Sequence, residues 1–182
     1  MAKTGMSTFK AKLLRPAKSD KDDAWAFLVL PKAASDTLPR RGRTAVEGAI
    51  NGHPFEATLE PDGQLSHWLK VSQEMCEAAH ASIGELVAVR IAPANPEPEP
   101  QLPDDLQKAL NACPVARTTW NDTTTIARID WIHWIESAKQ AKTRKSRVEG
   151  AMDMLSSGKK RVCCFDQSGF YSKSLSAPKS AD

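Results

Sequence analysis

The feature that most constrains this chain is a change in the spacing of its apolar residues. In the first half, apolar and polar residues alternate, which is the period of a half-buried β-strand. In the second half, apolar residues recur every three to four positions, as on one face of an α-helix. The change falls across residues 94–100, where prolines alternate with polar residues and favour a stiff, extended spacer. The sequence therefore predicts two differently folded parts joined by a linker.

Six short runs in the first half have the pattern of β-strands. The dipeptide Asn51-Gly52 separates two of them and prefers the positive φ angles of a type I′ turn, so these two runs are predicted to form a hairpin. Ser72 is placed to cap a short helix over 73–80. A small β-barrel is predicted, because closure removes the exposed edges of a sheet. The predicted strands are 7–13, 25–30, 43–50, 55–60, 64–71 and 85–91.

The second half contains three predicted helices. The first follows Pro103, since proline is favoured in a first helical turn. The second begins at Thr124, and the third covers 143–157 with Gly158 in the position of a C-cap. The apolar residues that define the three helical stripes are Leu106, Ala109 and Leu110; Ala127, Trp131, Trp134, Ile135 and Ala138; and Val148, Ala151, Met152 and Leu155.

These patterns predict an α+β chain: an N-terminal small six-stranded β-barrel with one short helix, followed by a three-helix C-terminal region. The barrel domain is expected at 7–94 and the linker of prolines and glutamates at 95–101. The helical domain is expected at 102–160. Residues 161–182 are expected to form a flexible tail, because serine-rich segments have little apolar surface to bury.

Composition excludes several classes of protein. No apolar run approaches the roughly 20 residues of a membrane-spanning helix, and no secretory signal is visible, so membrane insertion is not expected and a cytoplasmic location is. The four cysteines include no C-x-x-C pair, and neither a metal nor a cofactor is expected. The net charge of +3 is too small to indicate a nucleic-acid-binding surface over the whole protein.

Positive charge is nevertheless concentrated in one short segment without an acidic residue. Its members are Lys139, Lys142, Arg144, Lys145 and Arg147. One interpretation is a solvated helix face, and the other is an anion site for phosphate, nucleic acid or an acidic protein surface. Arg144 and Arg147 are three residues apart on a helix, so they can face one partner together. In a structural alternative, one of them pairs with an acid on the barrel, such as Glu56 or Glu60.

Other polar residues are weaker candidates. Asp130, His133 and Ser137 share one helix face, whereas a catalytic triad converges from different elements, so a polar helix face is expected. His67 is predicted on the inner face of its strand and Trp68 on the outer face, where it can contact the helical part or stack on a ligand. No phosphate-binding glycine loop, G-x-S-x-G or H-E-x-x-H motif occurs, and the chain is expected not to be an enzyme.

One segment of the helical half carries a recognisable motif. The residues that carry it are Trp131, Ile132, Ala138, Lys139, Thr143, Arg144 and Arg147. The segment resembles the W-I-x-x-A-K-x-x-x-T-R-x-x-R helix pair of a bacterial family, the YdeI or OmpD-associated, bacteriocin-protection proteins. The resemblance extends from Leu102 to Lys159.

The barrel half resembles a domain of unknown function that often precedes the helical one. This resemblance rests on Trp25, on Pro31-Lys32, on Val46-Glu47-Gly48, on the stretch 51–55 and on Gly84-Glu85. Together the two resemblances cover about 150 of the 182 residues. They carry no established catalytic residues.

For function, the resemblance implies a non-enzymatic cytoplasmic factor that binds a partner or protects against stress or antimicrobial agents. The first alternative is a nucleic-acid-associated protein that uses the basic helix face, and the second is an enzyme of unknown reaction. The expected partner is an unidentified protein or an anionic ligand, with nucleic acid possible but not favoured. The sequence indicates no oligomeric state.

Overall fold

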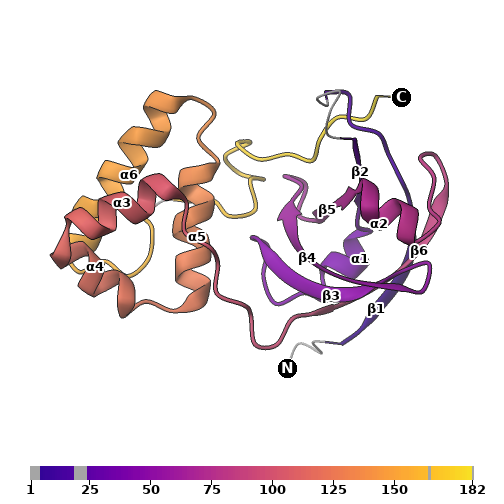
Figure 1. Cartoon of the computed structure of the whole chain (residues 1–182), viewed down its shortest axis with the longest axis horizontal. Coiled ribbons are helices and arrows are strands. Elements are labelled where there is room, and N and C mark those ends of the chain that lie inside the picture. Colours follow the sequence, from indigo (N-terminus) through magenta and orange to yellow (C-terminus); the bar gives the residue numbers. More distant parts are fainter. Residues whose placement is uncertain (1–4, 19–23, 164, 182) are drawn as a thin grey trace. The chain divides into compact units, whose positions relative to one another are not determined.

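The structure, a computed structural model, describes residues 5–18, 24–163 and 165–181. The chain divides into two compact units. The first, here called the β unit, comprises Met1–Pro96 and Ser168–Asp182; the second, the helical unit, comprises Glu97–Gln167. Figure 1 shows the strands of the one and the helices of the other. The chain thus passes from the β unit to the helical unit within the proline-rich segment, and it returns to the β unit near its end.

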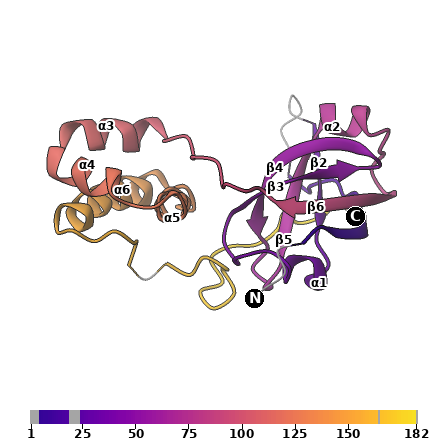
Figure 2. The ribbon, with the colours of Figure 1, turned by 90° about the horizontal axis from the view of Figure 1, so that it is seen from below.

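The described residues of the β unit form a six-stranded antiparallel sheet in the order β1-β6-β3-β4-β5-β2. The strands are β1 (Ser7–Lys12), β2 (Trp25–Val29), β3 (Thr44–Ile50), β4 (His53–Pro61), β5 (His67–Ser72) and β6 (Leu86–Pro93). The edge strands meet where Leu14 and Phe27 exchange two backbone hydrogen bonds of 2.8 and 2.9 Å. The sheet curls into a half-barrel rather than a continuously bonded cylinder (Figure 2). The prediction of six strands is confirmed.

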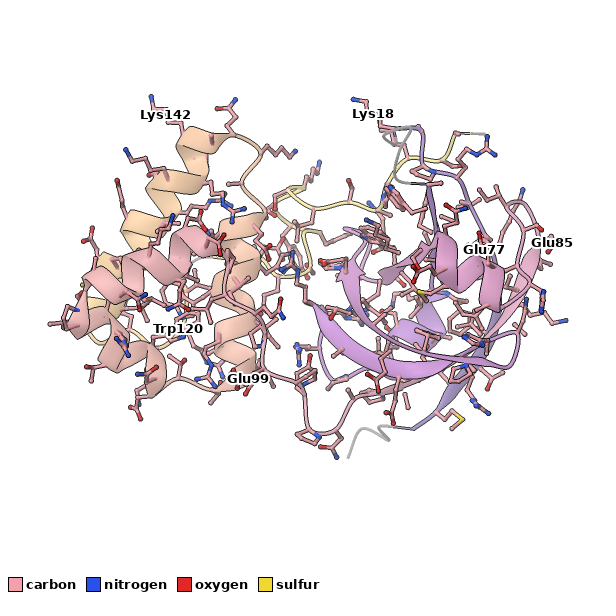
Figure 3. The ribbon with its side chains drawn as sticks, viewed as in Figure 1. Lys18, Glu77, Glu85, Glu99, Trp120 and Lys142 are labelled. Atoms are coloured by element: carbon pink, nitrogen blue, oxygen red, sulfur yellow. The ribbon has the colours of Figure 1, made fainter. Side chains whose placement is uncertain are left out.

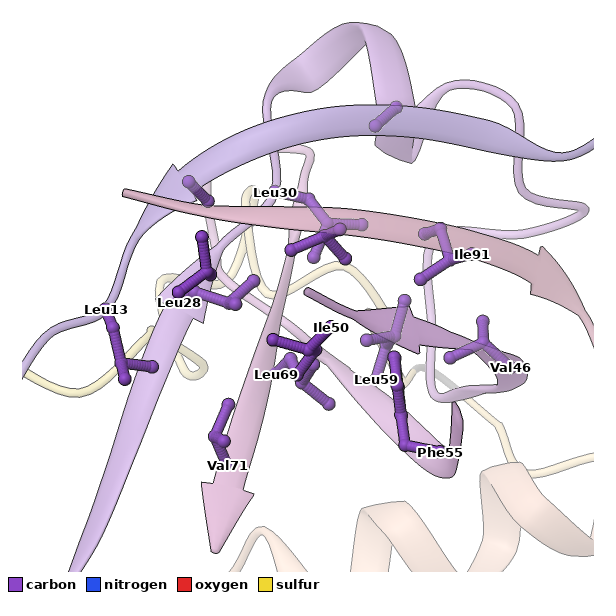
Figure 4. Packing of buried hydrophobic residues seen from close by; sticks show 14 of the residues in the cluster. Leu13, Leu28, Leu30, Val46, Ile50, Phe55, Leu59, Leu69, Val71 and Ile91 are labelled. Carbon is purple, nitrogen blue, oxygen red and sulfur yellow. The ribbon is translucent and has the colours of Figure 1, made fainter. Parts of the chain in front are cut away.

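The alternation that predicted the strands is also the alternation that fills the core. On β6, for example, Val87, Val89 and Ile91 are buried, whereas Ala88 and Arg90 between them are exposed. Figure 4 shows the buried side chains of the strands gathered into one cluster. Its larger members are Leu13, Leu28, Leu30, Val46, Ile50, Phe55, Leu59, Leu69, Val71 and Ile91.

Three residues in β3 and its hairpin turn have special backbone requirements. Asn51 and Gly52 have φ angles of 49° and 82°, so the predicted hairpin turn with two positive φ angles is confirmed. Gly48 pairs with both Phe55 and Ile91, and a Cβ atom there would lie 1.8 Å from the carbonyl oxygen of Arg90. Only glycine fits this close approach of β3 to β6.

The described part of the β unit contains two short helices, where the sequence predicted one. The predicted helix is α2 (Gln73–Ala78), and the Ser72 hydroxyl accepts a hydrogen bond of 3.2 Å from the amide of Met75, as the cap requires. The other is α1 (Lys32–Ser35). A helix of four residues spans barely one turn and has no apolar period, which explains why it was missed.

The prediction of three C-terminal helices was wrong, because the described residues of the helical unit form four. They are α3 (Asp104–Ala112), α4 (Pro114–Asn121), α5 (Thr125–Glu136) and α6 (Ala141–Ser156). The missed helix, α4, buries only Ala116 and Trp120, and one pair at i and i+4 is too short a pattern to reveal a helix. No helix in the described residues is long and apolar enough to span a bilayer.

The core of the helical unit forms around α5. The predicted start is confirmed, since the Thr124 hydroxyl accepts a hydrogen bond of 3.1 Å from the amide of Ala127. The predicted stripe is buried at Trp131 and Ile135, with Trp131 fully inaccessible. Trp120 of α4 packs in the same cluster and is labelled in Figure 3.

The linker and the tail both make specific contacts. Glu99, labelled in Figure 3, accepts two hydrogen bonds of 2.6 and 3.0 Å from the Arg128 guanidinium of α5. Residues 168–182, part of the tail that was predicted to be flexible, belong to the β unit. The amide of Ala17 donates to the carbonyl of Lys179 at 2.7 Å, and two further backbone bonds join the tail to this unit. Flexibility of the tail stays a prediction, but its place in the fold is beside the strands.

Candidate functional site

The basic segment identified in the sequence begins just before α6 (at Lys139) and continues into its first turns, and its five residues divide into two groups. Lys139, Lys142 and Lys145 are exposed, and Figure 3 shows Lys142 pointing into solvent. Arg144 is half-buried, and its guanidinium lies 2.7 and 3.2 Å from the two carboxylate oxygens of Asp105 in the first turn of α3. This two-bond fork lowers the pKa of Asp105 and raises the pKa of Arg144.

Arg147, the second arginine of the segment, also has a structural role. Its Nη1 donates to the carbonyl of Trp134 at 2.6 Å and to the Ser137 hydroxyl at 2.9 Å, at the end of α5. Its Cζ also lies 5.5 Å from the centre of the Trp134 ring. Arg147 therefore satisfies a carbonyl group that the helix leaves open at its C-terminus. The two arginines hold α6 against α3 and α5.

Pairing of Arg144 or Arg147 with Glu56 or Glu60 would join the two units, and it stays a prediction, but within the units Arg144 and Glu60 have other partners. Glu60 instead accepts from Arg43 at 2.9 Å within the β unit. The acidic first turn of α3, in the same unit as α6, supplies the partner of Arg144. Because Asp105 and Arg144 are 39 residues apart, no local spacing in the sequence could reveal the pair.

The remaining motif residues also serve packing. Trp131 is fully buried, and its indole Nε1 donates to the carbonyl of Lys160 at 3.2 Å. Ile132 is buried in the same cluster, while Ala138 and Thr143 are half-buried. By spacing, the W-I pair of the pattern falls on the next tryptophan and isoleucine, at 134–135, and not on Trp131 and Ile132. The motif thus describes how α5 meets α6, and the anion-binding prediction now rests on the three exposed lysines.

The polar residues of α5 and its C-cap, Asp130, His133 and Ser137, contact several other groups of the helical unit. Asp130 accepts a hydrogen bond of 2.7 Å from the amide of Gln167, and the His133 ring meets Phe165 edge to face at 5.1 Å. The Ser137 hydroxyl donates to the Trp134 carbonyl and accepts from Arg147. Each side chain therefore has contacts of its own. The expectation that the chain is not an enzyme stays a prediction.

His67 lies in a buried polar network of the β unit. Its Nε2 is 2.9 Å from the carbonyl oxygen of Gly42, and its Nδ1 is 2.6 Å from the Ser35 hydroxyl. A carbonyl only accepts, so Nε2 carries the proton and Nδ1 accepts from Ser35. Burial lowers the pKa of His67 below its ordinary value. The network joins α1 to β5, and its partner Ser35 belongs to the helix that the sequence did not reveal.

Trp68 packs in an aromatic cluster of the same unit. Its ring lies 6.4 Å from the Trp25 ring and 6.3 Å from the Phe27 ring, the latter in an edge-to-face arrangement. The Nζ of Lys70 lies 4.8 Å from the Trp25 ring. These contacts account for packing of Trp68 within the β unit. A ligand-stacking role stays a prediction.

A concave surface of about 580 Å³ crosses β6, β3 and β4, and we call it the β3 pocket. Glu47, Glu56 and Arg90 contribute exposed charged side chains, and apolar residues surround them. The apolar residues include Met6, Pro54 and Phe55. The sequence pattern indicated only that these residues alternate between the two faces of their strands. No spacing in the sequence predicts the pocket, because its walls come from three strands whose pairing is set by the fold.

The described residues show no group of three or more side chains suited to hold a metal ion. The pocket therefore offers charge and shape for binding rather than a metal centre, as far as the described part of the chain extends. Its two carboxylates and one guanidinium suit a ligand that carries charge of both signs.

In a comparison with known protein families, each part of the chain matches a described family model. Residues 99–158 match the family described as Bacteriocin-protection, YdeI or OmpD-Associated. Residues 9–91 match the Domain of unknown function (DUF1905). No curated protein matches the chain significantly. The resemblance that the sequence indicated is confirmed for the helical segment and for the strand-rich segment that precedes it.

The fork between Arg144 and Asp105 predicts a measurable coupling between α6 and α3. Changing each residue to Ala singly and together should give a coupling free energy of about 0.2–1 kcal/mol, because the pair is partly exposed. Urea unfolding at low and high salt measures it, and high salt should reduce it. Lys145→Ala, on the exposed side of α6, is the control and should show no coupling to Asp105→Ala. Coupling equal to that of the control would contradict the fork.

The buried neutral His67 predicts a loss of stability in mild acid. Its pKa is lowered from the ordinary 6.5, so below that pH the unfolded chain binds a proton that the folded chain does not. The contribution of the neutral His67 to the free energy of unfolding is complete above about pH 6.5. Below that pH it falls by up to about 1.4 kcal/mol per pH unit. Urea unfolding across this range should show a smaller pH dependence for His67→Gln than for wild type. The exposed His80→Gln variant should behave as wild type; equal behaviour of all three would refute the prediction.

Proposed function

We propose that this chain is a non-enzymatic, cytoplasmic binding factor that protects the cell by holding a partner molecule in the β3 pocket. The observation that carries the proposal is the pocket itself, which combines concave shape, exposed charges of both signs and apolar walls. Its volume of about 580 Å³ falls within the range usual for ligand sites, about 300–1,000 Å³. The protective role follows the description of the family that the helical segment matches.

The contacts in the helical unit support a binding role over catalysis. The arginines of the motif hold helices together, and Asp130, His133 and Ser137 each contact different groups. General acid–base or nucleophilic catalysis requires such groups to converge on one reacting atom. Binding requires only shape and complementary charge, which the β3 pocket supplies. The helical unit would then serve as a scaffold that accompanies the binding unit.

A survival assay tests this function. Bacteria that produce the chain should survive a panel of purified bacteriocins better than bacteria that do not. Ala92→Trp should abolish this gain, because Ala92 lines the pocket opposite Glu47 and an indole there fills it. Ala88→Trp is the matched control: it is exposed on the same strand but outside the pocket, and it should protect like wild type. Equal protection by both variants would contradict a role for the pocket.

Intact-mass measurement separates binding from catalysis. Incubating each protective combination of chain and bacteriocin should leave the mass of the peptide unchanged, since a binding factor makes and breaks no covalent bond. A modified or cleaved peptide in excess over the chain would instead establish the enzymatic alternative.

Nucleic-acid association is the second candidate, and the three exposed lysines at the start of α6 favour it. If Lys139, Lys142 and Lys145 contacted phosphates of duplex DNA, log K against log salt would have a slope of roughly −3. We expect no binding at physiological salt, because the two arginines of the segment are already engaged. Fluorescence anisotropy with labelled DNA measures this. Salt-sensitive binding that is lost in the triple Lys→Gln variant, and kept in the control Lys108→Gln, would overturn that expectation.

A further inference from the structure

We propose that the β3 pocket binds a short peptide in its zwitterionic form. Its N-terminal ammonium group would lie between Glu47 and Glu56, and its C-terminal carboxylate would contact Arg90. The inference rests on the proposed function, since it names the class of ligand that the pocket holds.

The two carboxylates face each other across neighbouring strands. Glu47 of β3 is the register partner of Glu56 of β4, and both side chains are exposed at the pocket. Directly opposite side chains have Cβ atoms about 4.5–5.5 Å apart, and like charges in that position repel. Among the ion pairs of the described residues, none involves either carboxylate. An ammonium group between them would replace this repulsion with two charge-assisted hydrogen bonds.

Arg90 supplies the opposite charge at a defined offset. It stands on β6 opposite Ala49, two residues beyond Glu47 along β3. Two residues of a strand span about 7 Å, which is also the length of two extended residues of a ligand. A guanidinium binds a carboxylate through two parallel hydrogen bonds. The offset between the charges of the pocket therefore matches the two ends of a peptide of two or three residues.

The apolar walls suit the middle of such a ligand. Met6 is 64% exposed, and the exposed Pro54 also lines the pocket, whereas the Phe55 side chain is buried in the core of the β unit. An apolar side chain of the peptide would remove this surface from water, which contributes to binding in proportion to the area covered. Gly48 also lines the pocket, and the carbonyl oxygen of Arg90 occupies the space that a side chain would take there.

Other classes of ligand fit the charges less well. A phosphate or nucleotide would be attracted by Arg90 but repelled by Glu47 and Glu56. A divalent cation would have only two carboxylates, and the described residues offer no larger group of ligating side chains at any position. A zwitterion is the class in which every charged group of the pocket gains a partner.

Calorimetric titration of the full chain with Ala-Leu-Ala tests the inference. The tripeptide with free ends should bind saturably, and N-acetylation or C-amidation should each weaken binding at least about tenfold, because each removes one charged contact. Free leucine, which is too short to reach both sites, should bind more weakly than the tripeptide. Saturable binding with these ratios supports the proposal.

Variants assign each end of the peptide to its partner. Glu47→Gln with Glu56→Gln should weaken the free tripeptide but leave the affinity of the N-acetylated form unchanged. Arg90→Gln should weaken the free tripeptide but leave the affinity of the amidated form unchanged. The matched controls are Glu149→Gln and Lys10→Gln, exposed residues outside the pocket, which should bind like wild type. Circular dichroism establishes that each variant is folded before titration.

Three results would overturn the inference: no saturable binding of the free tripeptide at millimolar concentration, equal affinity for free and end-blocked forms, or wild-type affinity in both sets of pocket variants. The proposed function fails separately, when Ala92→Trp protects cells as well as Ala88→Trp. A chain that protects through the pocket without binding the tripeptide would therefore refute only the ligand class. A chain that binds the tripeptide without protecting cells would refute only the function.

Discussion

The close approach of β3 to β6 at Gly48 is the constraint on which the geometry of the β unit depends. A Cβ atom at this position would overlap the carbonyl oxygen of Arg90, so the two strands reach this pairing only because the residue is glycine. The same stretch of β3 pairs with β4 on its other side. One position without a side chain therefore brings Arg90 onto the surface that carries Glu47 and Glu56, and the charged walls of the pocket follow from backbone geometry.

In the helical unit, charged side chains stabilise the packing of the helices. Arg144 and Arg147 stand on one face of α6, and each has a partner on a different helix, one a carboxylate and the other a helix end. The buried Trp131 and the half-buried Trp134 meet edge to face at 6.1 Å between these contacts. A family motif composed of tryptophans and arginines is thus explained by packing between helices, without a ligand. The exposed lysines beside them are chemically different, since they keep their charges in solvent.

The sequence predicted those elements that depend on residues close together in the chain. Alternation predicted the strands, Asn51-Gly52 the hairpin, and the hydroxyls of Ser72 and Thr124 two helix starts. The helix α4 was missed because its single buried pair is shorter than a helical period. The partner of Arg144 and the walls of the pocket were missed for another reason: both join residues far apart in the sequence, and no spacing rule encodes which strands or helices become neighbours.

The return of the chain to the β unit changes what counts as a domain in this protein. Because Ser168–Asp182 belongs to the β unit, the helical unit is an insertion, attached at both of its ends. A fragment that ends in the proline-rich segment lacks the residues that bond to the backbone at Arg15, Ala17 and Asp62. The two units are also joined by two covalent connections instead of one. Separating them in evolution or in the laboratory therefore requires a circular permutation or a loop replacement, not a single cut.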